Sequence, residues 1–303
     1  MVVLVTGANG QLGQAIQSIS GKYPEIDFVF CSSSDLDITN LENCQAVFST
    51  YQPHFCINTA AYTAVDKAES EPAKAFDINA NGAENLAITC KKHNTILIHI
   101  STDFVFDAYF SEGIAYYDRE LRLPLKSNLG LTETDVPFPS GVYGLTKLQG
   151  EQAIQANWDK HFIIRTSWVY SQFGNNFMKT MLRLASERDT LSVVSDQTGT
   201  PTNAVDLAEV LIVIMVSSFK FQVSSFGIYN FSNEGQCSWY DFAKEIFHQK
   251  GVSIDLKPIP TSAYPTPAKR PAYSVLDKTK IKSTFGVEIK EWQTSLATCI
   301  NQL

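Results

Sequence analysis

The sequence predicts an α/β protein, namely a Rossmann-type doubly wound parallel sheet with a smaller C-terminal lobe. Three observations lead to this prediction. Short apolar runs alternate with amphipathic stretches through the first half of the chain, which is typical of βαβ units. These runs are continuously apolar, as in strands of a sheet that is covered on both faces. A glycine-rich turn at residues 7–13, GANGQLG, follows the first run and opens a helix.

Each expected element follows from its periodicity and its flanking residues. The helix at 41–51, for example, ends before Pro53, because proline cannot continue a helix. Between residues 108 and 139 the periodicity is lost, and a loop of this length is usually functional. We expect strands at 2–5, 28–31, 55–58, 96–101 and 162–168, and helices at 13–20, 41–51, 72–93, 142–158, 176–188, 204–216 and 239–250.

The composition limits the classes of function. The chain has 303 residues, 44% hydrophobic and 18% charged, an ordinary globular mixture. Its net charge of −7 argues against nucleic-acid binding, which requires a basic surface. No apolar segment approaches the ~18 residues of a membrane span. Met1 leads directly into the first strand and leaves no room for a signal peptide, so we expect a cytoplasmic protein.

The cysteines give no sign of a metal centre. They are widely scattered, without a C-x-x-C pair or the spacing of metal ligands. We therefore expect reduced, mostly buried thiols at Cys31, Cys44, Cys56, Cys90, Cys237 and Cys299, and no metal site.

The glycine-rich turn predicts nucleotide binding. Gly7, Gly10 and Gly13 let the backbone approach a pyrophosphate, and the N-terminus of the following helix offers free N–H groups. Their spacing is that of short-chain dehydrogenases. The next strand ends in CSSS at 31–34, neither acidic nor basic, which does not distinguish NADH from NADPH. Asp37 lies just beyond this strand end, where it could either contact the adenine or cap the following helix.

We accordingly expect an NAD(P)-binding Rossmann domain at 1–170, with an irregular insertion at 108–131. Residues 171–303 would form mainly a substrate-binding lobe, with some elements returning to the Rossmann domain. Loops at the carboxyl ends of the strands are where such folds bind their ligands.

Tyr143 and Lys147 form the central pair. Four residues apart on a helix, their side chains lie on one face, and a nearby ammonium would lower the pKa of the phenol. Thr102 lies upstream at a strand end and can hydrogen-bond the same substrate oxygen. Threonine, tyrosine and lysine together can polarise a carbonyl while a nicotinamide delivers hydride, and the lysine can also hold the nicotinamide ribose.

Two further residues are candidates for the substrate pocket. Trp168 ends a strand and could stack on a sugar or base, or pack in the core. Arg270 lies in a proline-rich loop, where its planar fork could pair with a diphosphate; an ordinary surface cation is the alternative.

Several phrases of the sequence together resemble the dTDP-4-dehydrorhamnose reductases, a family of extended short-chain dehydrogenases. The resemblance spans nearly the whole chain, and TAVDKAE and TSWVY are far more specific than the glycine turn. It implies reduction of the 4-keto group of dTDP-4-dehydro-6-deoxy-L-mannose by NADPH or NADH, which gives dTDP-L-rhamnose, a precursor of cell-surface polysaccharide. The phrases are GANGQLG, NTAAYTAVDKAES, STDFVFD, VYGLTKLQGE, RTSWVY, DQTGTPT and RPAYSVLD.

The resemblance also implies roles for individual residues. The expected catalytic residues are Thr102, Tyr143 as the acid and Lys147 as its partner. Substrate contacts are expected at Thr102, Asp103 and Trp168. The cofactor is expected to meet Gly10, Gln11 and Leu12 with its pyrophosphate, Asp37 and Ile38 with its adenine, and to pass beside Ala60, Ala61 and Tyr62.

The chain departs from the family pattern in one place. After Asp107 the family usually has a glycine and a short link to a Thr-Glu-x-Asp segment, whereas this chain has Ala108 and a long stretch before Thr132. The insertion lies between Thr102 and Tyr143 along the chain. The insertion therefore affects the prediction of the sugar substrate more than the prediction of the reaction.

Two alternatives stay open at this point. A related epimerase or 4,6-dehydratase would share the fold, but a dehydratase carries glutamate after the aspartate, where this chain has Phe104 after Asp103. A non-catalytic relative, such as the regulatory subunit of methionine adenosyltransferase, would not need Thr102, Tyr143 and Lys147 together. The sequence also leaves open a homodimer and a divalent ion such as Mg²⁺.

Overall fold

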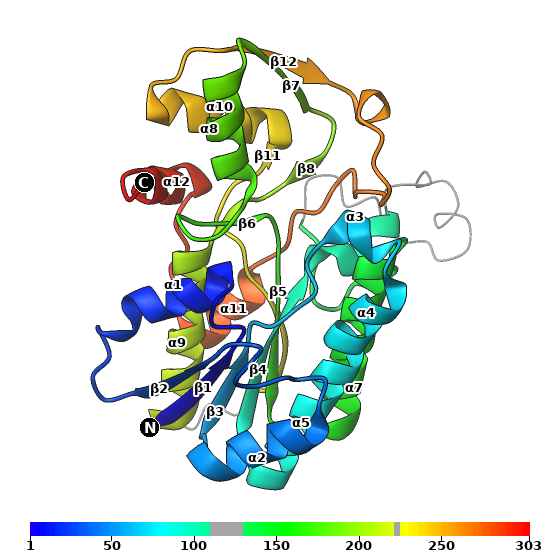
Figure 1. Ribbon diagram of the computed structural model, residues 1–303. Helices are drawn as coiled ribbons and strands as arrows, with labels where there is room; N and C mark the ends of the chain where they lie inside the picture. Colours follow the sequence, from blue (N-terminus) through cyan, green and yellow to red (C-terminus); the bar gives the residue numbers. More distant parts are fainter. Residues whose placement is uncertain (110–129, 221–224) are drawn as a thin grey trace.

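A computed structural model describes residues 1–109, 130–220 and 225–303 (Figure 1). Most of the insertion expected at 108–131 therefore lies outside the described residues. Within the described part, no helix is long and apolar enough to cross a membrane.

The core of the protein is a six-stranded parallel sheet, as predicted. Its order is β10-β5-β4-β3-β1-β2, and the chain runs from β1 to β2 on one side and to β3 on the other. Loops that leave β1 and β3 therefore separate at the carboxyl ends of these strands, which is where such folds bind dinucleotides. The strands are β1 (Val2–Thr6), β2 (Asp27–Cys31), β3 (Phe55–Asn58), β4 (Ile96–Thr102), β5 (His161–Thr166) and β10 (Gly227–Asn230).

Helices cover both faces of the sheet (Figure 1). One face carries α1 (Gln11–Ser20), α9 (Ala204–Lys220) and α11 (Thr279–Phe285), which share one apolar core with the strands. The other face carries α2 (Leu41–Tyr51), α5 (Gly82–His93) and α7 (Val142–Asn157) over a second core. This double coverage explains why the strands are continuously apolar.

The smaller lobe lies beyond the carboxyl ends of the sheet (Figure 1). Its core joins α8 (Phe177–Glu187), α10 (Trp239–Lys250) and α12 (Trp292–Ile300), and β7 (Thr190–Val194) pairs in parallel with β12 (Asp255–Ile259). The short strand β6 (Val169–Tyr170) pairs with β9 (Thr202–Asn203), and β8 (Thr198–Gly199) with β11 (Cys237–Ser238). Both α9 and β10 return to the sheet, and the division at residue 170 stays a prediction.

The helix expected at 72–93 is interrupted by a π-helical turn. It consists of α4 (Pro72–Phe76), the π turn η1 (Asp77–Asn81) and α5, preceded by the short α3 (Val65–Ala68). The amide of Asn79 within this turn binds the backbone N–H and C=O of Tyr62, and donates to Thr146 Oγ1 on α7. The prediction of one long helix over 72–93 is confirmed in its bounds, and the π turn within it places the Asn79 amide at Tyr62 and Thr146.

Candidate active site

The glycine turn has the shape that a pyrophosphate requires. Gly7 adopts φ of +64°, and a Cβ there would lie 2.8 Å from the backbone nitrogen of Ala60. A Cβ on Gly13 would lie 2.5 Å from the carbonyl oxygen of Gly7. Gly10 is the N-cap of α1 and has no side chain that could accept from the first N–H groups of the helix. These features fit a dinucleotide phosphate at the N-terminus of α1.

The two residues that follow Gly10 point away from this turn. The Gln11 side-chain oxygen accepts hydrogen bonds from Ser171 Oγ at 3.0 Å and Asn176 Nδ2 at 2.9 Å, which ties α1 to the smaller lobe. Leu12 is buried in the core beneath α1. Any contact of Leu12 with a phosphate would therefore be made by its backbone.

The region after β2 is held by carboxylates. Asp37 accepts hydrogen bonds from the N–H and hydroxyl of Thr39, so it is not the cap of α2, which is Asn40. The side chain of Ile38 is buried against α5, near Gly82. The expected contacts of Asp37 and Ile38 with adenine stay predictions.

Asp35 is a neighbouring acidic residue that the sequence interpretation missed. It accepts hydrogen bonds from the N–H and hydroxyl of Ser32, and these bonds lower the pKa of its carboxyl. Its position just beyond the strand end CSSS is the feature of the sequence that could have indicated it.

The loop after β3 passes directly beside the glycine turn. Ala60 contacts Gly7, as the close approach above shows, and Ala61 is partly exposed next to it. Tyr62 is buried, its hydroxyl donates to Glu71 Oε2 at 2.8 Å, and its ring packs with Ala68 and Ala75. Ala60 and Ala61 are thus placed where a cofactor lying on Gly7 would pass.

Thr102 and Tyr143 meet at the carboxyl end of β4. Thr102 is buried and donates to Asp103 Oδ1 at 3.1 Å. Its side chain lies close enough to the phenol of Tyr143 to lower the pKa of that group. The backbone N–H of Phe104 donates to Thr102 Oγ1, and the ring of Phe104 packs edge to face on Tyr143 with centroids 5.5 Å apart. The structure therefore brings together the threonine, aspartate and tyrosine that the sequence predicted.

The protonation of Tyr143 differs from the expectation. Burial raises its pKa to about 12, with a smaller lowering effect from the side chain of Thr102 and a raising effect from Asp103. The expectation that an ammonium lowers this pKa is wrong in this state, because Lys147 is directed elsewhere. The phenol is held as the neutral acid, which is the form that donates a proton.

Lys147 points into the sheet beneath Tyr143. It is 1% exposed, and its Nζ donates to the carbonyl oxygen of Ile100 at 2.7 Å and lies 3.2 Å from Nε2 of His99. Burial lowers its pKa to about 8, against the opposing effect of Glu151. His99 was not predicted; its signal was a single polar residue within the apolar run of β4.

A buried ion pair supports the same helix. Glu151 lies one turn after Lys147 on α7, and its two carboxylate oxygens accept from Nε of Arg165 at 2.9 Å and Nη2 at 2.6 Å. Ser101 donates to the same carboxylate at 2.5 Å. This cluster fixes α7, the helix that carries Tyr143 and Lys147, against β4 and β5.

Trp168 lies at the base of the smaller lobe, after β5 rather than within it. β5 ends at Thr166, two residues earlier than expected, and Trp168 adopts φ of +46°. Its ring stacks on Trp239, which the sequence interpretation missed, since the two residues are far apart along the chain.

Arg270 is engaged by a carboxylate within the chain. Its Nη1 and Nη2 bind the two oxygens of Asp66 at 3.0 and 2.8 Å, and Nη1 also donates to Thr266. The fork expected to hold a diphosphate therefore binds α3 in this structure. Its role toward a substrate stays a prediction.

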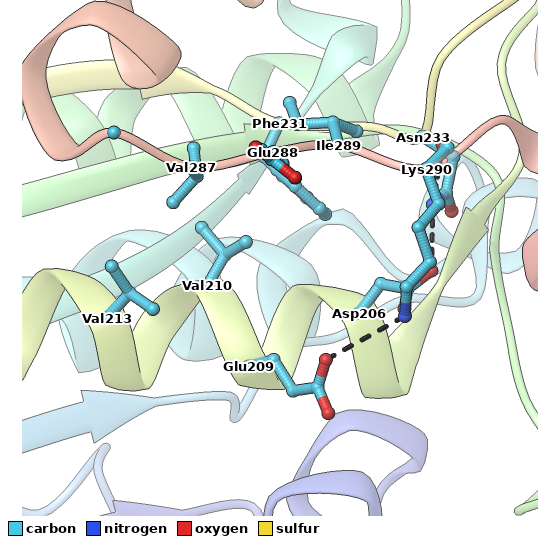
Figure 2. A pocket seen from close by; sticks show the side chains of 11 residues that line it. Asp206, Glu209, Val210, Val213, Phe231, Asn233, Val287, Glu288, Ile289 and Lys290 are labelled. Atoms are coloured by element: carbon cyan, nitrogen blue, oxygen red, sulfur yellow. Dashed lines mark hydrogen bonds and ion pairs between the residues drawn. The ribbon is translucent and has the colours of Figure 1, made fainter.

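A separate cavity of about 230 Å³ lies beside α9 (Figure 2), on the face of the sheet opposite α7 (Figure 1). It is bounded by α9 and the segment that leads to α12. Lys290 spans its polar end, with Nζ 2.8 Å from Asp206 and 3.9 Å from Glu209, and the hydrogen bond to Asp206 raises its pKa. These groups satisfy one another, and the cavity contains none of the predicted site residues.

Within the described ranges, no three His, Cys, Asp or Glu side chains cluster as metal ligands would. All six cysteines are free and buried.

The parallel sheet, the glycine turn and the grouping of Thr102, Tyr143 and Lys147 define a short-chain dehydrogenase/reductase. A family model described as the RmlD substrate binding domain matches residues 1–303. The dTDP-4-dehydrorhamnose reductase of Aggregatibacter actinomycetemcomitans is 41% identical, over 97% of this chain and 96% of that protein. The chain belongs to the dTDP-4-dehydrorhamnose reductase family.

Two solved structures agree with this assignment. The crystal structure of a dTDP-4-dehydrorhamnose reductase from Clostridium acetobutylicum is 40% identical, with a TM-score of 0.88 over 100% of this chain and 99% of that one. The Bacillus anthracis dTDP-4-dehydrorhamnose reductase, solved in complex with NADP, is 37% identical, with a TM-score of 0.87 and the same coverage.

Proposed function

We propose that this protein reduces the 4-keto group of dTDP-4-dehydro-6-deoxy-L-mannose to give dTDP-L-rhamnose, with NADPH or NADH. The observation that carries the proposal is that Thr102 lies near a neutral Tyr143, with the buried Lys147 one turn later on the same helix, in a chain of this family. A dTDP sugar and a reduced nicotinamide are the corresponding ligands.

In the proposed reaction, Tyr143, Thr102 and Lys147 each have a separate role. The reduced nicotinamide supplies the hydride. Tyr143 donates its proton to the keto oxygen as negative charge develops there, and the hydroxyl of Thr102 hydrogen-bonds the same oxygen. In the ligand-free protein the amine of Lys147 binds the carbonyl of Ile100, and during the reaction its ammonium turns toward Tyr143 and stabilises the negative charge left by the departing proton. Each turnover consumes one hydride and one proton and converts one carbonyl to a hydroxyl.

The alternative of a dehydratase is disfavoured by Phe104. A dehydratase needs a second acid or base at this position, and here an apolar ring packs on Tyr143. A non-catalytic role is disfavoured because the chain keeps the threonine, the tyrosine and the lysine together, with Thr102 and Lys147 buried and Tyr143 partly exposed.

The test is direct. Purified protein is mixed with NADPH or NADH and the enzymatically prepared dTDP-4-keto sugar, and oxidation of the nicotinamide is followed by absorbance, with the product identified by mass spectrometry. We expect oxidation that depends on the sugar. No oxidation with either cofactor would contradict the proposal.

A cytoplasmic location is supported by the six buried free thiols. Fractionation of cells tests it. A homodimer stays a prediction, for which sedimentation is the test.

A further inference from the structure

A row of buried polar side chains crosses the sheet beneath the glycine turn and ends at Lys147. Thr6, Asn58 and His99 are register partners on β1, β3 and β4, and none is more than 1% exposed. Thr6 Oγ1 donates to Asn58 Oδ1 at 2.6 Å, and Asn58 Nδ2 lies 2.9 Å from His99 Nδ1. Buried polar groups are costly unless hydrogen-bonded, and here each is bonded to the next.

The orientation of Asn58 fixes the tautomer of His99. The backbone N–H of Ala60 donates to Asn58 Oδ1 at 3.1 Å, in addition to the hydroxyl of Thr6. Because two donors meet this oxygen, the amide NH₂ faces Nδ1 of His99. An NH₂ group can only donate, so Nδ1 is the acceptor and the ring proton lies on Nε2.

The Nε2–H of His99 then points at the amine of Lys147. An ammonium can only donate hydrogen bonds, so it cannot accept this N–H. A neutral amine accepts the N–H of His99 with its lone pair and still donates an N–H to the carbonyl of Ile100. The neutral amine is thus the form that satisfies every bond in the row. Burial and the charge of Lys147 lower the pKa of His99 well below its ordinary value, so the ring itself stays neutral.

We propose that His99 is a positioning residue of the reductase. Held by Asn58 with its proton on Nε2, it favours the neutral amine of Lys147 over the ammonium and sets the pH at which this amine loses its proton. In the reaction proposed above, on which this inference rests, the ammonium stabilises the charge that develops on Tyr143. Activity therefore falls as the pH rises through the titration of Lys147.

The charged groups around Lys147 and His99 do not explain why activity should fall as the pH rises. Glu151 opposes the loss of the proton from Lys147, and Arg165 binds Glu151. His161 lies beyond His99, and Asp103 acts on Tyr143. The pKa of Tyr143 is about 12, so its own ionisation would reduce activity only at much higher pH than the titration of Lys147, whose pKa is about 8.

The first experiment needs no substrate. Nitrogen NMR of the ligand-free protein reports the histidine tautomers and the titration of lysine amines, with signals assigned through variants of His99 and Lys147. We expect the Nε2–H tautomer at His99 and a midpoint near 8 at Lys147. A spectrum with the proton on Nδ1, or an imidazolium at neutral pH, would overturn the inference whether or not the protein reduces the sugar.

The second experiment changes the donor that faces Lys147. In Asn58→Asp the carboxylate accepts from Nδ1–H of His99, which leaves Nε2 free to accept from the ammonium. In His99→Gln the side-chain oxygen can accept from it directly, without any added charge. Each variant should move the basic limb of the kcat/KM profile to higher pH by about one pH unit, as one hydrogen bond of ordinary strength would.

The matched control is His161→Gln, which replaces a buried histidine on β5 that binds the carbonyl of Trp158 instead. Its basic limb should stay at the wild-type pH. If Asn58→Asp and His99→Gln melt normally and also keep the wild-type limb, His99 has no such role. If a variant does not fold, the nitrogen NMR spectrum of the wild type decides whether His99 carries its proton on Nε2. Absence of sugar reduction by the wild type would contradict the proposed function alone.

Discussion

Trp168 and Trp239 stack face to face, with ring centroids 3.6 Å apart and ring planes 11° from parallel. Trp168 also lies against Gly199, where a Cβ would lie 2.6 Å from the indole. The stack therefore holds Trp168 in its left-handed conformation, which is unusual for a residue with a large side chain. Since the family resemblance places Trp168 at the substrate, Trp239 should act on substrate binding through it.

We predict that Trp239→Leu raises KM for the dTDP sugar about three- to tenfold, because an aromatic pair contributes about 0.5–1.5 kcal/mol beyond its buried area. KM for the nicotinamide should not change. Steady-state kinetics with each substrate varied in turn measure both values. Tyr264→Leu, which replaces an exposed aromatic residue, is the control. Equal effects of the two variants would show that the stack has no role in binding.

Tyr143→Phe removes the proton donor and keeps the ring that packs on Phe104. We expect kcat to fall about 10²- to 10⁴-fold, the usual contribution of a positioned acid, with cofactor affinity nearly unchanged. Turnover and fluorescence titration with NADPH provide the two measurements. Tyr229→Phe removes a buried hydroxyl that binds Ser225 instead, and should retain turnover. Near-normal turnover of Tyr143→Phe would exclude it as the acid.

The fold and much of the site could be predicted because they depend on local patterns. A strand, a glycine turn and a helix follow one another within 20 residues of the N-terminus, and β1 and α1 formed where apolar periodicity placed them. Tyr143 and Lys147 share one helix. Their common face follows from spacing alone.

Other features depend on contacts between distant segments. The bond between Arg270 and Asp66 joins residues 204 positions apart, and no local pattern announces it. The π turn depends on Asn79 reaching Tyr62. The direction of the Lys147 side chain depends on His99 and on the carbonyl of Ile100. Tyr143 and Lys147 share a helix as predicted, but the predicted lowering of the Tyr143 pKa by Lys147 is wrong.

Gly13→Ala should weaken cofactor binding at least tenfold, or destabilise α1. The added Cβ would lie 2.5 Å from the carbonyl oxygen of Gly7 and 2.6 Å from the Cα of Ala8, and backbone atoms cannot turn aside as a side-chain end can. Gly21→Ala, at the other end of the same helix, meets nothing within 4 Å and should bind normally. Titration with NADPH and thermal melting of both variants test this. Equal affinities would show that the turn tolerates a side chain.

Glu151→Gln should lower the free energy of unfolding by about 3–5 kcal/mol, because it leaves the buried charge of Arg165 without its partner. The control is Glu187→Gln, which breaks an exposed pair with Arg183 and should cost less than about 1 kcal/mol. Urea unfolding at neutral pH measures both. If the two losses were similar, the buried pair would not be holding α7 to β5.

Lys147→Met should make the protein more stable at neutral pH while removing its activity. In the folded protein the pKa of Lys147 falls from 10.5 to about 8. A fall of that size corresponds to a cost of about 3 kcal/mol for keeping the ammonium buried. Below pH 8 both folded and unfolded wild type carry the proton, so this cost is fully present. Between pH 8 and 10.5 only the unfolded chain keeps it, so wild-type stability rises relative to the variant.

The difference in free energy of unfolding between variant and wild type should therefore be largest below pH 8 and shrink as the pH approaches 10.5. Urea unfolding at several pH values measures this difference, in which titrations common to both proteins cancel. Lys244→Met, at an exposed position on α10, provides the matched control and should show no such trend. A constant difference for Lys147→Met across this range would mean that the folded protein holds this amine as an ordinary ammonium, and the polar row at His99 would then have no effect on it.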